Sequence, residues 1–280
     1  MKRCIVCGSV QCIPLYAGII RCSKCGHVFA DLLLGHKRLK KIYGKKYFFG
    51  NEYSNYLKDK GVLQKNFNLR LEVLKKFLIP SRHKHLLEIG CAYGFFLDLA
   101  KQQFETVTGI DITEDGILYA QKQLKLNVVK ADFLKHNFSK QKFDVVCLWD
   151  TIEHLERPNL FLEKISKLTK KGSLIAITTG DINSLNARLR GKSWRLIHPP
   201  THLHYFSGKT LSRLLAQKGF KVTYNRHCGY FRSFDLASYN LFVLHHKLFW
   251  IYNLLHHTGL INSDFFLDLH DIMYLIAVKQ

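Results

Sequence analysis

Two glycines and two acidic residues are spaced along one stretch of the sequence in a way that suits the binding of a nucleoside. Gly90 and Gly94 follow a short apolar run and precede a helical pattern. Glycine lets a ligand approach the bare backbone, where the amides and the dipole of a helix face it. The next apolar run ends in Asp111, 23 positions after Glu88. An acid at that strand tip commonly accepts hydrogen bonds from ribose hydroxyls, so the spacing predicts an adenosine-type ligand. A dinucleotide is not predicted, because the GxGxxG spacing is absent.

Four cysteines near the N-terminus form two CxxCG knuckles separated by 14 residues: Cys4, Cys7, Cys22 and Cys25. Each knuckle can place two thiolates on one metal ion, and four thiolates make a closed tetrahedral site. The sequence therefore predicts a structural zinc ion. The alternatives are incidental cysteines or two disulfides. No secretory signal is recognisable at the N-terminus, so we expect the eight cysteines to be reduced and the protein to be cytoplasmic.

A third group of polar residues follows the apolar run 143–149. Asp150, Glu153 and His154 fall within one helical turn, and they are expected at the carboxyl edge of a sheet, where α/β sites collect. They could bind a divalent cation or hold a general base. The alternative is a structural hydrogen-bonded pair.

The apolar pattern supplies the elements that must position these groups. It predicts strands over 85–89, 106–112, 128–131, 143–149, 173–179 and 220–225, with helices over 63–78, 95–100, 114–124, 160–168 and 210–218 between them. This alternation indicates an α/β fold with a parallel sheet.

Four motifs occur in an order that resembles the class I S-adenosylmethionine-dependent methyltransferases: Glu88–Gly94, Gly109–Asp111, Ala131–Phe133 and Phe143–His154. The resemblance covers roughly residues 60–280 and departs at Ala92, where many members carry glycine. It implies a Rossmann-like seven-stranded sheet in which the last strand, 272–278, is inserted antiparallel. It also implies S-adenosylmethionine as the cofactor.

The resemblance implies roles for individual residues. Asp132 would bind the adenine amino group and Phe133 would pack on the ring, although Asp132 could instead cap a helix. The full set of cofactor contacts implied is Glu88, Gly90, Cys91, Gly94, Asp111, Ile112, Asp132, Phe133 and Asp150. Ubiquinone-biosynthesis O-methyltransferases look similar around residues 150–154, where an acid, a glutamate and a histidine are implicated in metal binding. Their acid is usually glutamate, which is longer than Asp150.

Histidines supply the candidates for a general base. The pattern Pro-x-x-His-x-x-Tyr-Phe-Ser, near residues 199–207, looks like the substrate-covering segment of these methyltransferases. His202 is the first candidate to take a proton from an acceptor hydroxyl, with His204 or His198 in reserve. Glu153 and His154 are the other catalytic candidates. A structural role is the alternative for each of them.

The expected organisation has three parts. Residues 1–30 form a zinc ribbon, 31–60 a basic, aromatic linker, and 61–280 the methyltransferase domain, with insertions near 181–206 and 231–268. The linker aromatics could form a lid, contact nucleic acid or pack the ribbon onto the main domain. Leu241–Leu255 is expected to form one apolar helix, which would be buried, roof a hydrophobic substrate or lie on a membrane. It is too short and too often interrupted to span a bilayer.

The net charge of +21 points to an anionic environment, such as nucleic acid, an acidic membrane surface or a phosphorylated substrate. A generally basic surface with no particular partner is the alternative. The interpretation that we favour is a methyltransferase acting on a small molecule or glycan, with oxygen as the acceptor atom. An RNA methyltransferase and a non-catalytic zinc-ribbon adaptor are the alternatives. The sequence does not predict an oligomeric state.

Overall fold

A seven-stranded sheet forms the centre of the computed structural model, which describes residues 3–32, 56–245, 247–259, 261 and 263–280. Strand order across the sheet is β10-β13-β8-β7-β4-β5-β6. The strands are β4 (His85–Ile89), β5 (Thr106–Asp111), β6 (Asn127–Lys130), β7 (Phe143–Trp149), β8 (Thr169–Gly180), β10 (Phe220–His227) and β13 (Ile272–Lys279). All pairs from β8 to β6 are parallel, and β13 runs antiparallel between β8 and β10. The predicted fold class and the antiparallel last strand are confirmed.

Helices cover both faces of this sheet, as its continuous apolar strands require. Neighbouring strand residues alternate between the two cores: Leu87 and Val146 belong to one, Leu86 and Val145 to the other. Apolar residues of α5 (Pro158–Leu168) and α7 (Gly208–Ala216) complete the first core. The second contains residues of α2 (Lys60–Lys75), α3 (Phe95–Ala100) and α4 (Glu114–Lys122). Ser207 caps α7, as predicted.

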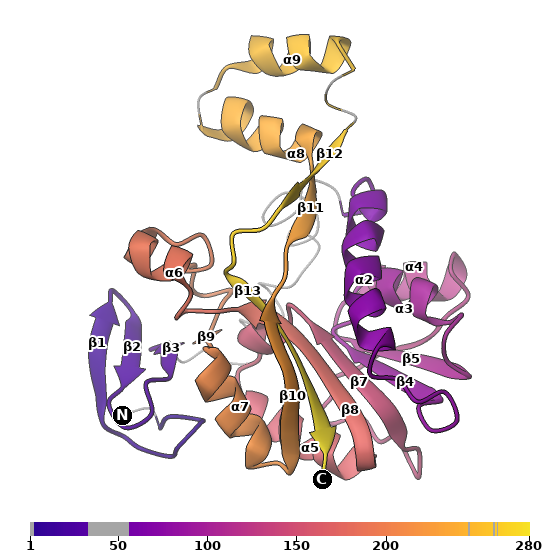
Figure 1. Cartoon of the computed structure of the whole chain (residues 1–280). Coiled ribbons are helices and arrows are strands. Elements are labelled where there is room, and N and C mark those ends of the chain that lie inside the picture. Colours follow the sequence, from indigo (N-terminus) through magenta and orange to yellow (C-terminus); the bar gives the residue numbers. More distant parts are fainter. Residues whose placement is uncertain (1–2, 33–55, 246, 260, 262) are drawn as a thin grey trace.

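The N-terminal ribbon, which we define as residues 3–32, forms a second sheet with a strand that lies more than 170 residues further along the chain. Its strands are β1 (Cys12–Tyr16), β2 (Ile19–Cys22) and β3 (Val28–Ala30). The fourth strand is β9 (His204–Tyr205), which pairs antiparallel with β3. Figure 1 shows the ribbon beside the main sheet, with β9 between them. The segment before β9 contains α6 (Leu185–Arg190) and the short helix η3 (Gly191–Ser193).

The insertion near 231–268 forms a projection, which we define as residues 230–267. Strands β11 (Tyr230–Ser233) and β12 (Asp264–Leu267) pair antiparallel. Between them lie α8 (Phe234–Ser238), η4 (Tyr239–His245) and α9 (Phe249–His257). The prediction of one helix over 241–255 is wrong, since Lys247 takes a left-handed φ of 54° between η4 and α9. None of the helices in the described part of the chain is long and apolar enough to cross a membrane.

Most of the predicted linker falls outside the described residues. Residues 33–55 include the basic patch around 37–46 and the aromatics from Tyr43 to Tyr53. Tyr56 is described, and it is buried in a stack of rings with Tyr93 and Phe95, whose centroids lie 5.2 and 5.5 Å away.

Candidate active site

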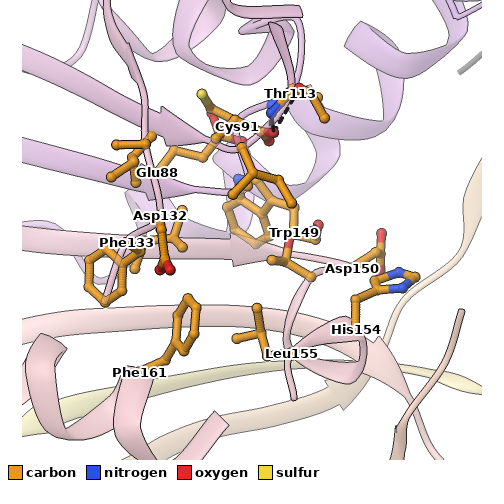
Figure 2. Close-up of a pocket in the computed structure, with 18 of the residues that line it drawn as sticks. Glu88, Cys91, Thr113, Asp132, Phe133, Trp149, Asp150, His154, Leu155 and Phe161 are labelled. Carbon is orange, nitrogen blue, oxygen red and sulfur yellow. Dashed lines mark hydrogen bonds between the residues drawn. The ribbon is translucent and has the colours of Figure 1, made fainter. Parts of the chain in front are cut away.

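A pocket of about 670 Å³ opens at the carboxyl ends of β4, β5, β6 and β7, beside α2. Its size is within the range of small-molecule sites. Figure 2 shows acids, aromatic rings and His154 pointing into it from several different elements. Of the nine residues expected to contact a cofactor, all but Gly94 line it: Glu88, Gly90, Cys91, Asp111, Ile112, Asp132, Phe133 and Asp150.

The turn between β4 and α3 brings bare backbone to the pocket. Gly90 has a left-handed φ of +80°, and a Cβ atom there would lie 2.7 Å from the Thr151 side chain. Gly94 is the left-handed N-cap of α3, where a Cβ would lie 2.7 Å from Leu126. It is therefore required by the turn even though it does not line the pocket. Ala92 adopts a φ of 44°, so alanine accepts the conformation that favours glycine here.

Asp111 is held in place by three hydrogen bonds. Its Oδ1 accepts from the backbone N–H and the hydroxyl of Thr113, at 2.8 and 2.7 Å, and its Oδ2 accepts from the N–H of Ala92 at 2.9 Å. Burial raises the pKa of the Asp111 carboxyl, and the hydrogen bonds oppose that shift. Two carboxylate oxygens offer about four acceptor positions, so one remains for a ligand.

Glu88 lies beside Asp111 at the floor of the pocket and is almost fully buried, with 3% of its surface exposed. Its Oε2 has no hydrogen-bond partner among the described residues. Burial, with a contribution from the charge of Asp111, raises the pKa of Glu88 well above its usual value. A group that donates a hydrogen bond or carries positive charge would satisfy this oxygen.

The loop after β6 supplies the next wall of the pocket. Asp132 Oδ1 accepts a hydrogen bond from the N–H of Leu134 at 2.9 Å, so one of its oxygens is used in the turn. The ring of Phe133 stacks on that of Phe161 at 5.2 Å, and both rings line the pocket. Lys164 of α5 donates to the carbonyl oxygens of Phe133 and Leu134, at 2.6 and 3.1 Å, and thereby fixes the loop.

Asp150 faces a residue that the sequence analysis missed. Its carboxylate lies 3.5 Å from the guanidinium of Arg70, which is 5% exposed and lines the pocket from α2. The Nε of Arg70 has no partner among the described residues. The signal was available, because Arg70 falls on the apolar stripe of α2, three residues after Phe67 and four before Leu74. A cation in that stripe has to be buried, which points to a function.

Glu153, His154 and His202 bring their ligand atoms within 4.8 Å of one another. His154 lines the pocket, whereas Glu153 and His202 are not among the lining residues and lie behind it. The Nδ1 atoms of His154 and His202 lie 2.9 Å from the carbonyl oxygens of Thr201 and Leu196. A carbonyl accepts, so each imidazole is protonated on Nδ1 and has its lone pair on Nε2.

The pKa values in this cluster move in opposite directions. Burial raises the pKa of Glu153 to about 8, with a contribution from the charge of Asp150. Burial lowers the pKa of His154 to about 4 and that of His202 well below its usual range. The cluster differs from the predicted group of Asp150, Glu153 and His154. It contains Glu153 and His154, but its third member is His202 and not Asp150.

His204 lies elsewhere. It belongs to β9, and its Nδ1 is 3.1 Å from the Nε2 of His27 in the ribbon. Both rings are buried against Phe206, and His204 does not line the pocket. Neither His202 nor His204 lines the pocket, so the expectation that His202, or His204 in its place, acts as the general base is not supported by their positions.

The two cysteine knuckles have matching geometry. In each, the N–H of the following glycine donates to the carbonyl of the first cysteine: Gly8 to Cys4 at 2.8 Å and Gly26 to Cys22 at 2.9 Å. The Sγ atoms of Cys4, Cys7, Cys22 and Cys25 lie within 4.8 Å of one another, and none of the four forms a disulfide. Thiolates on a tetrahedral zinc ion would be about 3.8 Å apart. The cluster therefore has the composition and the compactness of a metal site.

A comparison with protein families agrees with this geometry. Residues 63–237 match the family described as "Methyltransferase domain". The chain belongs to this methyltransferase family. The chain therefore contains an S-adenosylmethionine-dependent methyltransferase domain.

Curated relatives of the methyltransferase include two ubiquinone biosynthesis O-methyltransferases. That of Pelagibacter ubique (strain HTCC1062) is 30% identical over 132 residues, which cover 41% of this chain and 54% of the relative. That of Glaesserella parasuis serovar 5 (strain SH0165) is 28% identical over 106 residues, which cover 34% of this chain and 45% of the relative. The match spans about half the length of these curated relatives.

Solved structures share the fold of the methyltransferase. Magnesium protoporphyrin IX methyltransferase from Synechocystis PCC 6803, with bound SAH, has a TM-score of 0.55 at 12% identity and covers 88% of this chain and 100% of its own. An S-adenosylmethionine-dependent methyltransferase from Thermotoga maritima has a TM-score of 0.54 at 17% identity and covers 83% and 96%. At these identities the likeness extends to the fold alone.

Proposed function

We propose that this chain transfers the methyl group of S-adenosylmethionine to a hydroxyl oxygen of a small molecule or glycan. One observation carries the proposal: a single pocket has an adenosine-type site at Asp111 and, on another wall, an imidazole whose lone pair is set by a backbone hydrogen bond. The curated relatives are named as O-methyltransferases, which supports oxygen as the acceptor atom.

The residues of the pocket fit this cofactor. Asp111 has one acceptor position left for a ribose hydroxyl, and Gly90 leaves room for the ligand to pass close to the backbone. Asp132 and the Phe133 ring would hold the adenine. Arg70 would meet the methionyl carboxylate, and the unsatisfied oxygen of Glu88 suits a positively charged group. Cys91, Ile112 and Asp150 complete the lining of this site.

When bound, the cofactor supplies a methyl group that is already activated by the adjacent sulfonium. The work left to the chain is to align the acceptor, exclude water and remove a proton. Burial lowers the pKa of His154 to about 4, so its imidazole is unprotonated at neutral pH, the form in which Nε2 can accept that proton. His202 packs edge-on against His154, with ring centroids 4.6 Å apart, and orients it. Glu153, with a pKa of about 8, keeps its proton at neutral pH.

A divalent cation is the alternative occupant of this cluster. Glu153, His154 and His202 present one carboxylate and two imidazoles, a ligand set that suits transition metals better than Mg²⁺. Each imidazole already donates its other N–H to a backbone carbonyl, as metal-ligating histidines usually do. Asp150 points instead toward Arg70. Metal analysis of the purified wild type and of His202→Ala tests whether this cluster binds a divalent cation or serves in proton transfer.

The four-cysteine cluster of the ribbon would hold a structural zinc ion. All four ligand positions are thiolates, which leaves none for a water molecule or a substrate. The tight knuckle turns at Gly8 and Gly26 place both pairs of sulfur atoms together.

The test is a calorimetric titration of S-adenosylmethionine into the wild type, Asp111→Ala and the exposed control Asp115→Ala, with zinc quantified in each sample. We expect binding in the wild type and the control and a loss of at least about tenfold in affinity in Asp111→Ala. The absence of binding to the zinc-replete wild type would favour the adaptor. Methylation of RNA, together with RNA binding that weakens steeply with salt, would favour an RNA methyltransferase, which is the alternative that the +21 charge suggests.

A further inference from the structure

The base of the projection borders the pocket. Asn66, which lines the pocket, accepts a hydrogen bond from the N–H of Phe231 at 2.5 Å and donates to its carbonyl oxygen at 3.0 Å. Lys65 pairs with Asp264 at 2.6 Å, and Lys58 pairs with Asp235. These contacts fix β11 and β12 against α2. Figure 1 shows the two strands leading away from the seven-stranded sheet and carrying α8 and α9 at their far end.

The far end exposes large apolar side chains. Among the described residues of α9, none is buried, and Phe249, Trp250 and Leu254 are 59%, 67% and 57% exposed. Other exposed apolar side chains of the projection are Phe234, Leu241 and Phe266. An ordinary soluble surface exposes large apolar side chains singly and far apart. Several of them on one element mark an interaction site.

The charge of this region selects the partner. Residues 236–263 contain no aspartate or glutamate, and they contain Lys247 and four histidines. The acids at the base, Asp235 and Asp264, are already paired with lysines. The whole chain carries +21, so a second copy placed against this apolar end would bring two strongly basic molecules together. An anionic bilayer attracts the chain and accepts aromatic side chains at its headgroup level.

We propose that the projection docks on the surface of an anionic membrane, with Phe249, Trp250 and Leu254 inserted among the lipid headgroups. The nine residues of α9 are too few to cross a bilayer, so the helix lies in the interface. Because the base of the projection is fixed beside the pocket, docking through α9 tethers the domain that contains the pocket to the membrane.

Tryptophan fluorescence offers a direct test with the full chain. Trp149 and Trp194 are 6% and 2% exposed, so a change on docking would come from Trp250. Vesicles of phosphatidylcholine with phosphatidylglycerol should shift the emission to the blue, brominated lipid should quench it, and high salt should weaken both effects. Pure phosphatidylcholine vesicles should bind much less.

Flotation assays with two variants complete the test. The double variant Phe249→Ser, Trp250→Ser should lose about tenfold or more in partitioning to the anionic vesicles, whereas Ile79→Ser, at a site outside the projection that is 52% exposed, should keep it. Retained binding of S-adenosylmethionine by all three proteins shows that they are folded. Equal partitioning of the double variant and the wild type would overturn the proposal, as would no partitioning of the wild type. The proposal would also be overturned if the wild type did not bind the vesicles and instead formed a dimer or bound single-stranded RNA, and if the double variant lost that property.

Discussion

The Nε2 atom of His27 lies 3.1 Å from the Nδ1 atom of His204, and the two stacked imidazoles join the ribbon to the domain that contains the pocket. His27 is 0% exposed and His204 4% exposed. Burial, with a smaller contribution from His204, keeps the pKa of His27 well below its usual value, so the His27 imidazole is neutral at neutral pH.

Removing this contact should destabilise the protein. His204→Ala leaves the Nε2 of His27 without this partner and opens a cavity beside Phe206, which we expect to cost about 1–3 kcal/mol in the free energy of unfolding. Urea denaturation measures it. His270→Ala is the matched control, because that side chain is 75% exposed. A difference between the two variants of less than about 0.5 kcal/mol would count against a structural role for His204.

Loss of the proposed zinc ion should affect the pocket through backbone hydrogen bonds. The N–H of Ala30 in the ribbon donates to the carbonyl of Leu203, and the N–H of Leu203 donates to the carbonyl of Glu153, each at 2.9 Å. We expect Cys7→Ser to lower the zinc content and to speed hydrogen exchange at Leu203 by about tenfold or more. Cys12→Ser is the control, since Cys12 lies outside the cluster. Unchanged exchange in zinc-free protein would show that β9 is held by the main domain alone.

The pKa of Glu88 predicts how stability depends on pH. Burial raises the pKa of Glu88 in the folded state above its value in the unfolded chain. At a pH between these two pKa values, the unfolded chain has lost a proton that the folded protein still binds. The stability of the folded state without cofactor should therefore fall as the pH rises from about 4 toward the folded pKa. Glu88→Gln removes this dependence and should be more stable than the wild type at pH 7, while the exposed Glu72→Gln should behave like the wild type. Thermal denaturation over this pH range measures both, and parallel pH profiles for all three proteins would contradict the argument.

Arg70 should contribute to cofactor affinity rather than to catalysis. Arg70→Gln removes the buried cation beside Asp150, and we expect S-adenosylmethionine to bind about 10- to 100-fold more weakly. The exposed Arg226→Gln should bind normally. Calorimetry gives the Kd, and an unchanged Kd for Arg70→Gln would assign this arginine to holding Asp150 alone.

Motifs that depend on local spacing were predictable from the sequence, and pairings across the chain were not. The glycine turn, Asp111 at the end of β5 and the cysteine knuckles are set by residues close together in the chain. The pairing of β3 with β9 joins segments more than 170 residues apart, and no periodicity encodes it. It moves His204 into the ribbon sheet. The break at Lys247 was missed for another reason: a left-handed lysine has no sequence signature, and the apolar pattern continues through it.

His154 should affect turnover without affecting cofactor binding, because the proposed function assigns it to the acceptor and not to S-adenosylmethionine. His154→Gln should lower kcat by about 10²- to 10⁴-fold once an acceptor is found, with the Kd of S-adenosylmethionine unchanged. Burial lowers the pKa of His154 to about 4, so the wild-type rate should not fall between about pH 7 and pH 6, where an ordinary histidine would become protonated. Steady-state kinetics over this range test both statements. The exposed His257→Gln serves as the control, and a rate that declines with a pKa near 6.5 in the wild type would mean that another histidine accepts the proton.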